Sequence, residues 1–225
     1  MSNKPFDKIK NTGRCLLTYD TEKYEFVRHI QEWFNCIDLS KIHEHYKSDF
    51  DLITKKTDQA TIFHKKFYSM PIDNPFYSTY RSFIKNEIQP MFDEEIIFQK
   101  VPTFRAQVPG NYSVAEWHKD SDYNHLTEEL NIFLPITSAQ NNNTIWAETQ
   151  PNKADYSPMN AEPGEYYIWP GSSLIHGNKV NDTGFTRLSV DFRVLPYSKY
   201  SDNDRQSVSN NTKMVIGHYF DRFRS

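Results

Sequence analysis

The chain contains 225 residues with 26 basic and 29 acidic side chains, and its formal net charge is −3. This length suits one domain with a sizeable buried core. The weak negative charge, without a basic stripe interleaved with aromatics, disfavours a nucleic-acid partner. No apolar run approaches the roughly 20 residues that a membrane helix needs, so we expect no membrane partner.

The cysteines and the opening segment bear on the cellular compartment. Cys15 and Cys36 have no metal-ligand spacing, and two cysteines do not make a disulfide framework. The first 20 residues contain no hydrophobic signal core. We therefore expect a cytoplasmic protein with two free thiols. Nothing in the sequence indicates an oligomeric state.

From about Tyr24 to Phe92 the apolar residues recur at helical spacing. A first helix, predicted over 24–37, places four of them on one stripe: Phe26, Ile30, Phe34 and Ile37. A second, predicted between a start signal at Asp73 and Asn74 and a stop at Pro90, has five: Phe76, Tyr80, Phe83, Ile84 and Ile88. Three histidines of this region have no partner at ligand spacing, and we expect them to be surface or core residues: His43, His45 and His64.

From about Glu95 onward the pattern alternates, and Pro, Gly and Asn separate short runs. The predicted strands are TFRAQVPG, EWHKD, LNIFLPI, NTIWAET, GEYYIWPG, SSLIHGN and TRLSVDFRVLP. Many short strands with such punctuation predict a sandwich or a barrel. The polar segment 198–213 is predicted to be a linker or loop, and the aromatic end 214–225 to dock on the core.

The stretch EWHKDSDYNH, residues 116–125, concentrates two histidines and several carboxylates. On a strand, side chains two residues apart share one face, so His118 and Asp120 are expected to point the same way. An imidazole and a carboxylate on one face are two members of the 2-His-1-carboxylate triad of non-haem Fe(II) oxygenases. Because SDYN reads as a turn, we expect Asp122 and His125 on a loop at the mouth of the cavity.

A second histidine stands at the end of an apolar run, where SSLIHGNKV contains His176. The next run, TRLSVDFRV, alternates cleanly, with an apolar face of Thr186, Leu188, Val190, Phe192 and Val194 and a polar face of Arg187, Ser189, Asp191 and Arg193. Such a strand is either an edge that faces water or the wall of a polar cavity. A guanidinium fork beside a hydroxyl suits the bidentate capture of a carboxylate.

The pattern of H-x-D at 118–120, His176 and R-x-S at 187–189 resembles the Fe(II)/2-oxoglutarate-dependent oxygenases. More narrowly, the segment from about Phe104 to Pro196 looks like the oxygenases of streptomycin-type biosynthesis. This resemblance implies a double-stranded β-helix, a jelly-roll or cupin-like barrel, within a single domain over 1–225. A helical buttress would occupy about 1–95, the β-helix core about 96–196 and a tail 197–225.

The resemblance also implies the site. Fe(II) would be held by His118, Asp120 and His176, which would be the catalytic residues, with 2-oxoglutarate bound by Arg187 and Ser189 and O2 as the further cosubstrate. Halogenating relatives lack the carboxylate ligand, so Asp120 favours hydroxylation, or a related oxidation such as desaturation or ring closure. Polar strand faces add the residues expected to support 2-oxoglutarate or the metal ligands: Gln107, Asn131 and Thr144. Others are expected to contact substrate: Arg105, Trp146, Glu148 and His125.

Three functions fit these residues. An oxygenase with a small polar organic substrate, such as a sugar, an aminocyclitol or an amino-acid derivative, is favoured. A metal-dependent cupin enzyme that does not use 2-oxoglutarate would leave the Arg187 and Ser189 pair without a purpose. A non-enzymatic β-barrel ligand-binding module would require that the three metal-ligand candidates lie apart. Nucleophilic catalysis and nucleotide binding have no supporting motif, since G-x-S-x-G, P-loop and G-x-G-x-x-G patterns are absent.

Overall fold

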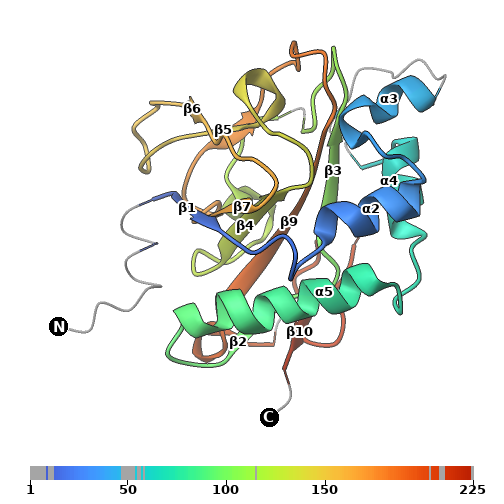
Figure 1. Ribbon diagram of the computed structural model, residues 1–225. Helices are drawn as coiled ribbons and strands as arrows, with labels where there is room; N and C mark the ends of the chain where they lie inside the picture. The colour runs from blue at the N-terminus through green and yellow to red at the C-terminus, as the bar shows by residue number, and fades with distance from the viewer. Residues whose placement is uncertain are drawn as a thin grey trace.

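The computed structural model describes residue 9 and residues 13–46, 54, 57, 59–114, 116–202, 204–207 and 211–223. It is a mainly antiparallel β structure with a few helices (Figure 1). The strands are β1 Cys15–Thr18, β2 Ile96–Gln99, β3 Thr103–Gln107, β4 Leu130–Pro135, β5 Ile145–Ala147, β6 Ser157–Pro158, β7 Glu165–Trp169, β8 His176–Asn178, β9 Arg187–Pro196 and β10 Phe220–Arg222. The helices are α2 Phe26–Phe34, α3 Ile42–His45, α4 Ile62–Tyr68 and α5 Pro75–Phe83.

The strands form two sheets. The larger has the order β1-β7-β4-β9-β2-β10, and β3 also pairs with β9. The smaller has the order β6-β5-β8. A cluster of buried side chains lies between them, contributed by β4 and β7 on one side and β5 on the other: Phe133, Trp169 and Ala147, with Ala139, Met159 and Leu174. The two sheets therefore pack against each other on one side of β4 and β7.

The other face of the large sheet carries the main core, which the helices cover (Figure 1). The apolar residues of β9, from Leu188 to Val194, pack there with the aromatic residues of α2, α4 and α5. Because β9 pairs with β4 on one side and with β2 and β3 on the other, it is a central strand. Its polar face is thus the wall of a cavity, and the alternative of a solvent-facing edge is excluded.

Local signals set the helix ends. The Asn74 side chain accepts a hydrogen bond from the Phe76 N–H at 2.9 Å, and Pro75 occupies the first turn, as expected for a helix start. The predicted stripe of this second helix is fully buried. The α-helix itself stops at Phe83 and continues as a π-helix over Ile84–Ile88 and a 3-10 turn over Gln89–Met91.

Two expectations about elements are corrected, and the expected docking of the tail on the core is confirmed. Ile37 is 91% exposed and not on the buried stripe, because α2 ends at Phe34 and Asn35 turns the chain with a positive φ of 50°. The predicted helical buttress also contributes a strand, β1, which pairs with β7. The tail supplies β10, which pairs with β2. Neither short strand has enough alternating residues to be distinguished from its surroundings in the sequence.

Cys15 and Cys36 are not joined to each other in a disulfide. Among the described helices, none has both the length and the apolar character that crossing a membrane requires.

Candidate metal centre and adjoining cavities

The H-x-D segment is not the strand that its alternation predicted. His118 pairs with His176 through two backbone hydrogen bonds of 2.9 Å, as an isolated bridge. The chain then turns into a 3-10 helix, η4, over Asp120–Tyr123, because the Asp122 carboxylate accepts the Lys119 N–H at 3.0 Å. The Asp120 N–H donates to the Gly171 carbonyl at 3.0 Å. Backbone pairing thus brings the two distant segments together.

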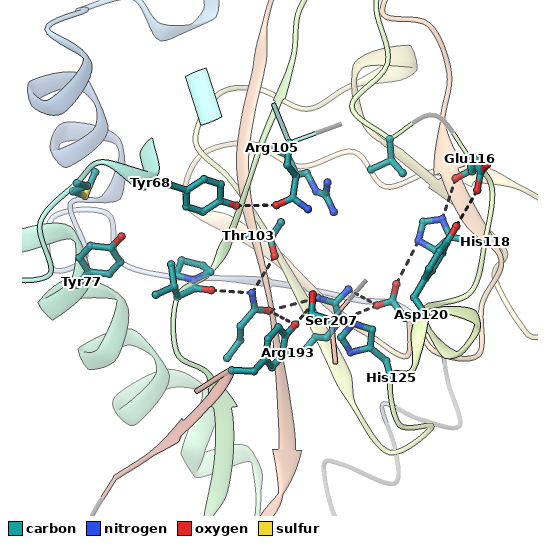
Figure 2. Close-up of a pocket in the computed structure, with 18 of the residues that line it drawn as sticks. Tyr68, Tyr77, Thr103, Arg105, Glu116, His118, Asp120, His125, Arg193 and Ser207 are labelled. Carbon is teal, nitrogen blue, oxygen red and sulfur yellow. Dashed lines mark hydrogen bonds and ion pairs between the residues drawn. The ribbon is translucent and has the colours of Figure 1, made fainter. Parts of the chain in front are cut away.

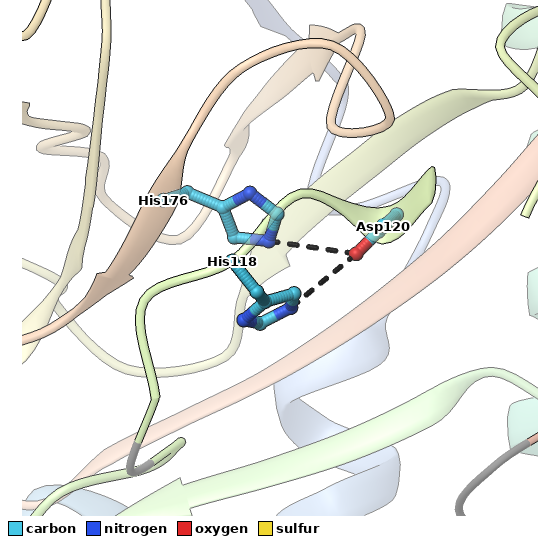
Figure 3. Close-up of side chains that lie close together, drawn as sticks. All are labelled: His118, Asp120 and His176. Atoms are coloured by element: carbon cyan, nitrogen blue, oxygen red, sulfur yellow. Dashed lines mark ion pairs between the residues drawn. The ribbon is translucent and has the colours of Figure 1, made fainter. Parts of the chain in front are cut away.

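The three predicted ligands converge (Figure 3). The Nε2 atoms of His118 and His176 each lie 3.5 Å from Oδ1 of Asp120, and the potential ligand atoms all lie within 4.8 Å of one another. Two ligand atoms that each stand about 2.1 Å from one ion are at most about 4.2 Å apart. The two 3.5 Å separations satisfy this limit, and the widest pair would have to draw slightly closer around an ion. The donor set of two imidazoles and one carboxylate is that of non-haem iron sites with open positions, so these residues fit Fe(II).

Both histidines are already in the orientation that ligation needs. The Nδ1 atom of His118 lies 3.0 Å from the Glu116 carbonyl, and that of His176 lies 2.9 Å from the Leu174 carbonyl. A carbonyl only accepts, so each Nδ1 must carry the proton and donate it. The lone pair is then on Nε2, the atom that faces Asp120. Such hydrogen bonds fix the ring and its tautomer for a metal.

The two oxygens of Asp120 have different environments. Oδ2 accepts hydrogen bonds from Asn131 Nδ2 at 2.7 Å and from Arg193 Nε and Nη2 at 3.0 and 2.7 Å. Burial raises the pKa of Asp120, but the Arg193 charge opposes burial and holds that pKa well below its usual range. Asp120 is therefore an anion with Oδ1 left for a metal.

An inner cavity of about 50 Å³ adjoins the triad and reaches Arg187. Arg187 is only 1% exposed. Among the described residues, no hydrogen-bond partner reaches its Nε or Nη1, and no carboxylate forms a salt bridge with it. Burial lowers the pKa of Arg187 to about 9, so the guanidinium is still charged at neutral pH.

Further buried donors belong to the same region. The Trp169 indole N–H and the Ser113 hydroxyl line the inner cavity, and the Ser189 hydroxyl is buried on the same face of β9 as Arg187. None of the three has a hydrogen-bond partner among the described residues. Buried polar groups are normally satisfied, and an unpaired buried charge is costly. The chemistry of this donor set fits a carboxylate, and therefore one end of 2-oxoglutarate.

A much larger outer cavity of about 700 Å³ adjoins the same His118 and Asp120 side chains (Figure 2). Arg105 and Arg193 line both cavities. The far wall comes from the helical region that the sequence suggested was only a buttress: Tyr68 of α4, Met70 and Ile72 of the following loop, and Tyr77 of α5. The outer cavity is therefore the place where a substrate could approach the triad.

The structure places the predicted supporting residues in different roles. Asn131 lies opposite Arg193 in the β4–β9 pairing and holds Asp120. Gln107 donates to the carbonyls of Asn111, Asn142 and Lys179, and thus ties loops together beside Arg187, its partner in the β3–β9 pairing.

The polar face of NTIWAET does not reach the cavities. The Thr144 hydroxyl donates to the Met159 carbonyl, and the Trp146 ring packs against the Lys179 ammonium at 3.3 Å. The Glu148 carboxylate accepts the N–H groups of Ala154 and Ile175. The opposite face of β5 points inward instead, with Ile145 lining the inner cavity and Ala147 in the inter-sheet core. The alternation of side chains along this segment was predicted correctly, but the face that points inward was not.

Two predicted substrate contacts do line the outer cavity, Arg105 and His125. Arg105 also forms an ion pair with Asp191, at 3.3 Å. Sequence reasoning did not assign Ser113 or Trp169 to the site, and it expected Arg193 in the cavity wall without foreseeing that it would hold Asp120. Arg193 has a usable signal, since it shares the polar face of β9 with Arg187. Ser113 lies in a loop without periodicity, so no sequence pattern marks it.

Comparison with known proteins gives one close relative in sequence and several in fold. No protein-family model matches the chain. The streptomycin biosynthesis protein StrG of Streptomyces griseus is 37% identical over 170 residues, which cover 75% of this chain and 79% of StrG. The non-heme alpha ketoglutarate dependent carbocyclase SnoK from nogalamycin biosynthesis superimposes with a TM-score of 0.53 at 9% identity, covering 100% of this chain and 97% of SnoK. EvdO2 from Micromonospora carbonacea var. aurantiaca gives 0.52 at 13% identity, covering 87% and 91%.

Proposed function

The chain belongs to the family of the streptomycin biosynthesis protein StrG, and on this premise we propose that it is an Fe(II)- and 2-oxoglutarate-dependent dioxygenase. It hydroxylates a C–H bond of a small polar metabolite in a biosynthetic pathway, and sugars, aminocyclitols and amino-acid derivatives are the candidate classes. The two packed sheets are, in this proposal, the halves of a double-stranded β-helix.

One observation carries the proposal. A buried arginine with two unpaired N–H groups stands beside a convergent His-Asp-His triad, and the inner cavity touches both. A triad alone would fit many metal enzymes. An unpaired, buried guanidinium calls for an anion, and the carboxylate of 2-oxoglutarate supplies one beside the metal.

The residues of the chain have separate tasks in this proposal. His118, Asp120 and His176 hold Fe(II), and Arg187 with Ser189 binds the carboxylate of 2-oxoglutarate that is remote from the metal. When bound, iron and 2-oxoglutarate supply the activation of O2 that oxidises a C–H bond. Arg193 and Asn131 keep Asp120 in one orientation. The buried walls around Arg187 exclude water and strengthen its attraction for an anion.

The test separates the carboxylate site from the metal site. 2-Oxoglutarate is titrated calorimetrically into full-length protein loaded with Mn(II), for the wild type and for Arg187→Ala. Each charge-assisted hydrogen bond contributes about 1.5–3 kcal/mol, so the affinity should fall by about 10- to 100-fold, while Mn(II) affinity stays the same.

Arg28→Ala is the matched control, because Arg28 is exposed on α2 and forms salt bridges with Glu25 and Glu32. That variant should bind 2-oxoglutarate like the wild type. An Arg187→Ala protein with wild-type affinity for 2-oxoglutarate would show that Arg187 does not bind its carboxylate.

A further inference from the structure

A buried histidine–carboxylate pair stands beside the metal centre without being part of it. The Nδ1 atom of His125 lies 2.7 Å from Oε2 of Glu129, and the two side chains are 8% and 1% exposed. His125 follows η4, and Glu129 immediately precedes β4. Neither residue is one of the proposed metal ligands.

The contacts of Glu129 determine which nitrogen of His125 carries the proton. Oε1 of Glu129 accepts the Leu126 N–H at 2.9 Å, and Arg193 Nε lies 3.9 Å from Oε2. Glu129 is thus surrounded by donors and acts as an acceptor at both oxygens. His125 must then donate from Nδ1, which leaves the lone pair on Nε2. Within the described residues, Nε2 has no hydrogen-bond partner.

The ring lines the outer cavity, beside the triad (Figure 2). The backbone N–H of His125 also donates to the backbone carbonyl of Asp120 at 3.3 Å, so the histidine is fixed to the same turn that positions the carboxylate ligand. Across the cavity the wall is partly apolar, with Met70, Ile72 and Tyr77. A molecule between these walls would meet an acceptor on one side and apolar surface on the other.

We propose that His125 Nε2 accepts a hydrogen bond from a hydroxyl or an amine of the substrate, and that Glu129 holds the imidazole in the tautomer that can do so. This inference rests on the proposed function and adds the substrate chemistry: a carbon skeleton with an O–H or N–H donor on one side and an apolar face on the other. His125 orients that skeleton so that a C–H bond faces the triad.

The test reads the His125 nitrogen directly by long-range ¹H–¹⁵N NMR of the full chain, with Zn(II) in the metal site. The His125→Phe variant assigns the resonance by its loss. In the wild type, Nδ1 should be protonated and Nε2 unprotonated. Three probes are then titrated: myo-inositol with hydroxyl donors, cyclohexylamine with an amine donor, and 1,4-dioxane, a ring without donors.

A shift of the Nε2 resonance with myo-inositol, and none with 1,4-dioxane, is the expected result and identifies a hydroxyl as the donor. A shift with cyclohexylamine alone also supports the inference and identifies an amine. Glu129→Gln should abolish the response, because an amide N–H can donate to Nδ1 and place the ring proton on Nε2.

Three results would overturn the inference: an Nε2 that is protonated in the wild type, an Nε2 resonance that neither donor moves, or one that 1,4-dioxane moves equally. The visible charge-transfer band of wild-type protein with Fe(II) and 2-oxoglutarate tests the proposed function separately, because it reports on the triad and the 2-oxoglutarate site. An intact band without a donor response overturns only the role of His125.

Discussion

Asp120 shows how single residues define this centre. One oxygen faces both histidines and the other accepts three hydrogen bonds, from Asn131 and Arg193. Gly171 makes this arrangement possible: a β-carbon on it would lie 2.6 Å from the Asn131 amide nitrogen. That contact is far closer than non-bonded atoms allow, so Asn131 can reach Asp120 only beside a glycine.

Gly171→Ala should therefore displace the Asn131 amide and loosen Asp120. Outer partners of metal ligands are typically worth about 10- to 100-fold in metal affinity, so we expect a loss of about 10-fold for Co(II), measured by competition with a chelating dye. Ser173→Ala in the same loop should bind Co(II) like the wild type. Equal affinities for all three proteins would mean that the Asn131 hydrogen bond does not support the site.

The buried side chain of His64 affects how the stability of the protein depends on pH. It is completely buried, its Nδ1 pairs with the Thr61 hydroxyl at 2.7 Å, and burial together with the Arg105 charge lowers its pKa from 6.5 to about 3. Between these values the unfolded chain binds a proton that the folded chain does not bind. The free energy of unfolding must then decrease as the pH falls below 6.5.

One such proton changes stability by about 1.4 kcal/mol per pH unit. His64→Gln should remove up to this slope from the dependence of the unfolding free energy on pH, measured by urea denaturation between neutral and mildly acidic pH. His45→Gln, at an exposed position, is the control and should keep the wild-type slope. A wild-type slope in His64→Gln would show that His64 is not the group responsible.

For single residues, the sequence indicated which side chains could form a site better than it indicated which way each side chain points. His118, Asp120, His176 and Arg187 could be recognised in the sequence because their spacing and chemistry are distinctive. The structure brings the first three together and places Arg187 on the adjoining cavity. The family resemblance is confirmed by the identity to StrG. Thr144, Trp146 and Glu148 point away, because alternation separates two faces of β5 without saying which one meets the partner sheet. The metal-binding role of His118, Asp120 and His176 and the cofactor-binding role of Arg187 stay predictions.

Among the elements, β9 organises both sides of the molecule. Its apolar side chains enter the helix-covered core, and its polar ones reach the two cavities. The sequence showed the alternation but could not decide between an edge strand and a central one, because that depends on β2, β3 and β4 pairing along both sides. Such long-range pairing leaves no local mark.

The same substitution at two positions of β9 should have opposite effects. Arg187→Met removes a buried charge that has no ion pair among the described residues, and should raise the melting temperature of the ligand-free protein at neutral pH. Arg193→Met leaves Asp120 buried without its partner, and should destabilise the metal-free protein by about 3–5 kcal/mol. Differential scanning calorimetry measures both.

The sign for Arg187 follows from its pKa, which burial lowers from 12.5 to about 9 in the folded protein. The charged form penalises folding below pH 9, and this penalty decreases as the pH rises above 9. The stabilisation in Arg187→Met should therefore be largest below pH 9. A lower melting temperature in both variants would mean that Arg187 has a compensating partner in the free protein.

The start of helix α5 depends on a short sequence signal, the Asn74 cap. The helix carries Tyr77 to the outer cavity and Tyr80 and Phe83 to the core. Asn74→Ala should cost about 1 kcal/mol of unfolding free energy, measured by urea denaturation. Asn86→Ala, an exposed change beyond the end of α5, should cost less. The idea that this cap fixes α5 fails if the two costs are equal.

For the whole molecule, the sequence predicted a mainly β chain with helices at its N-terminal side, and this coarse description is confirmed. The contribution of the helical region to the outer cavity was not foreseen, because a cavity wall made by Tyr68, Met70 and Tyr77 looks in sequence like any amphipathic helix surface. The tail is likewise joined to the centre: the Tyr219 hydroxyl contacts both Gln99 and Arg193.

In the proposed function, one chain holds a His-Asp-His iron site and, beside it, a buried site for a carboxylate. The most direct measurement is the visible spectrum of metal-free protein, under anaerobic conditions, after addition of Fe(II) and then 2-oxoglutarate. We predict a metal-to-ligand charge-transfer band that requires both additions and disappears in His176→Ala. Fe(II) binding without that band would contradict the 2-oxoglutarate site, and no Fe(II) binding at all would contradict the metal centre itself.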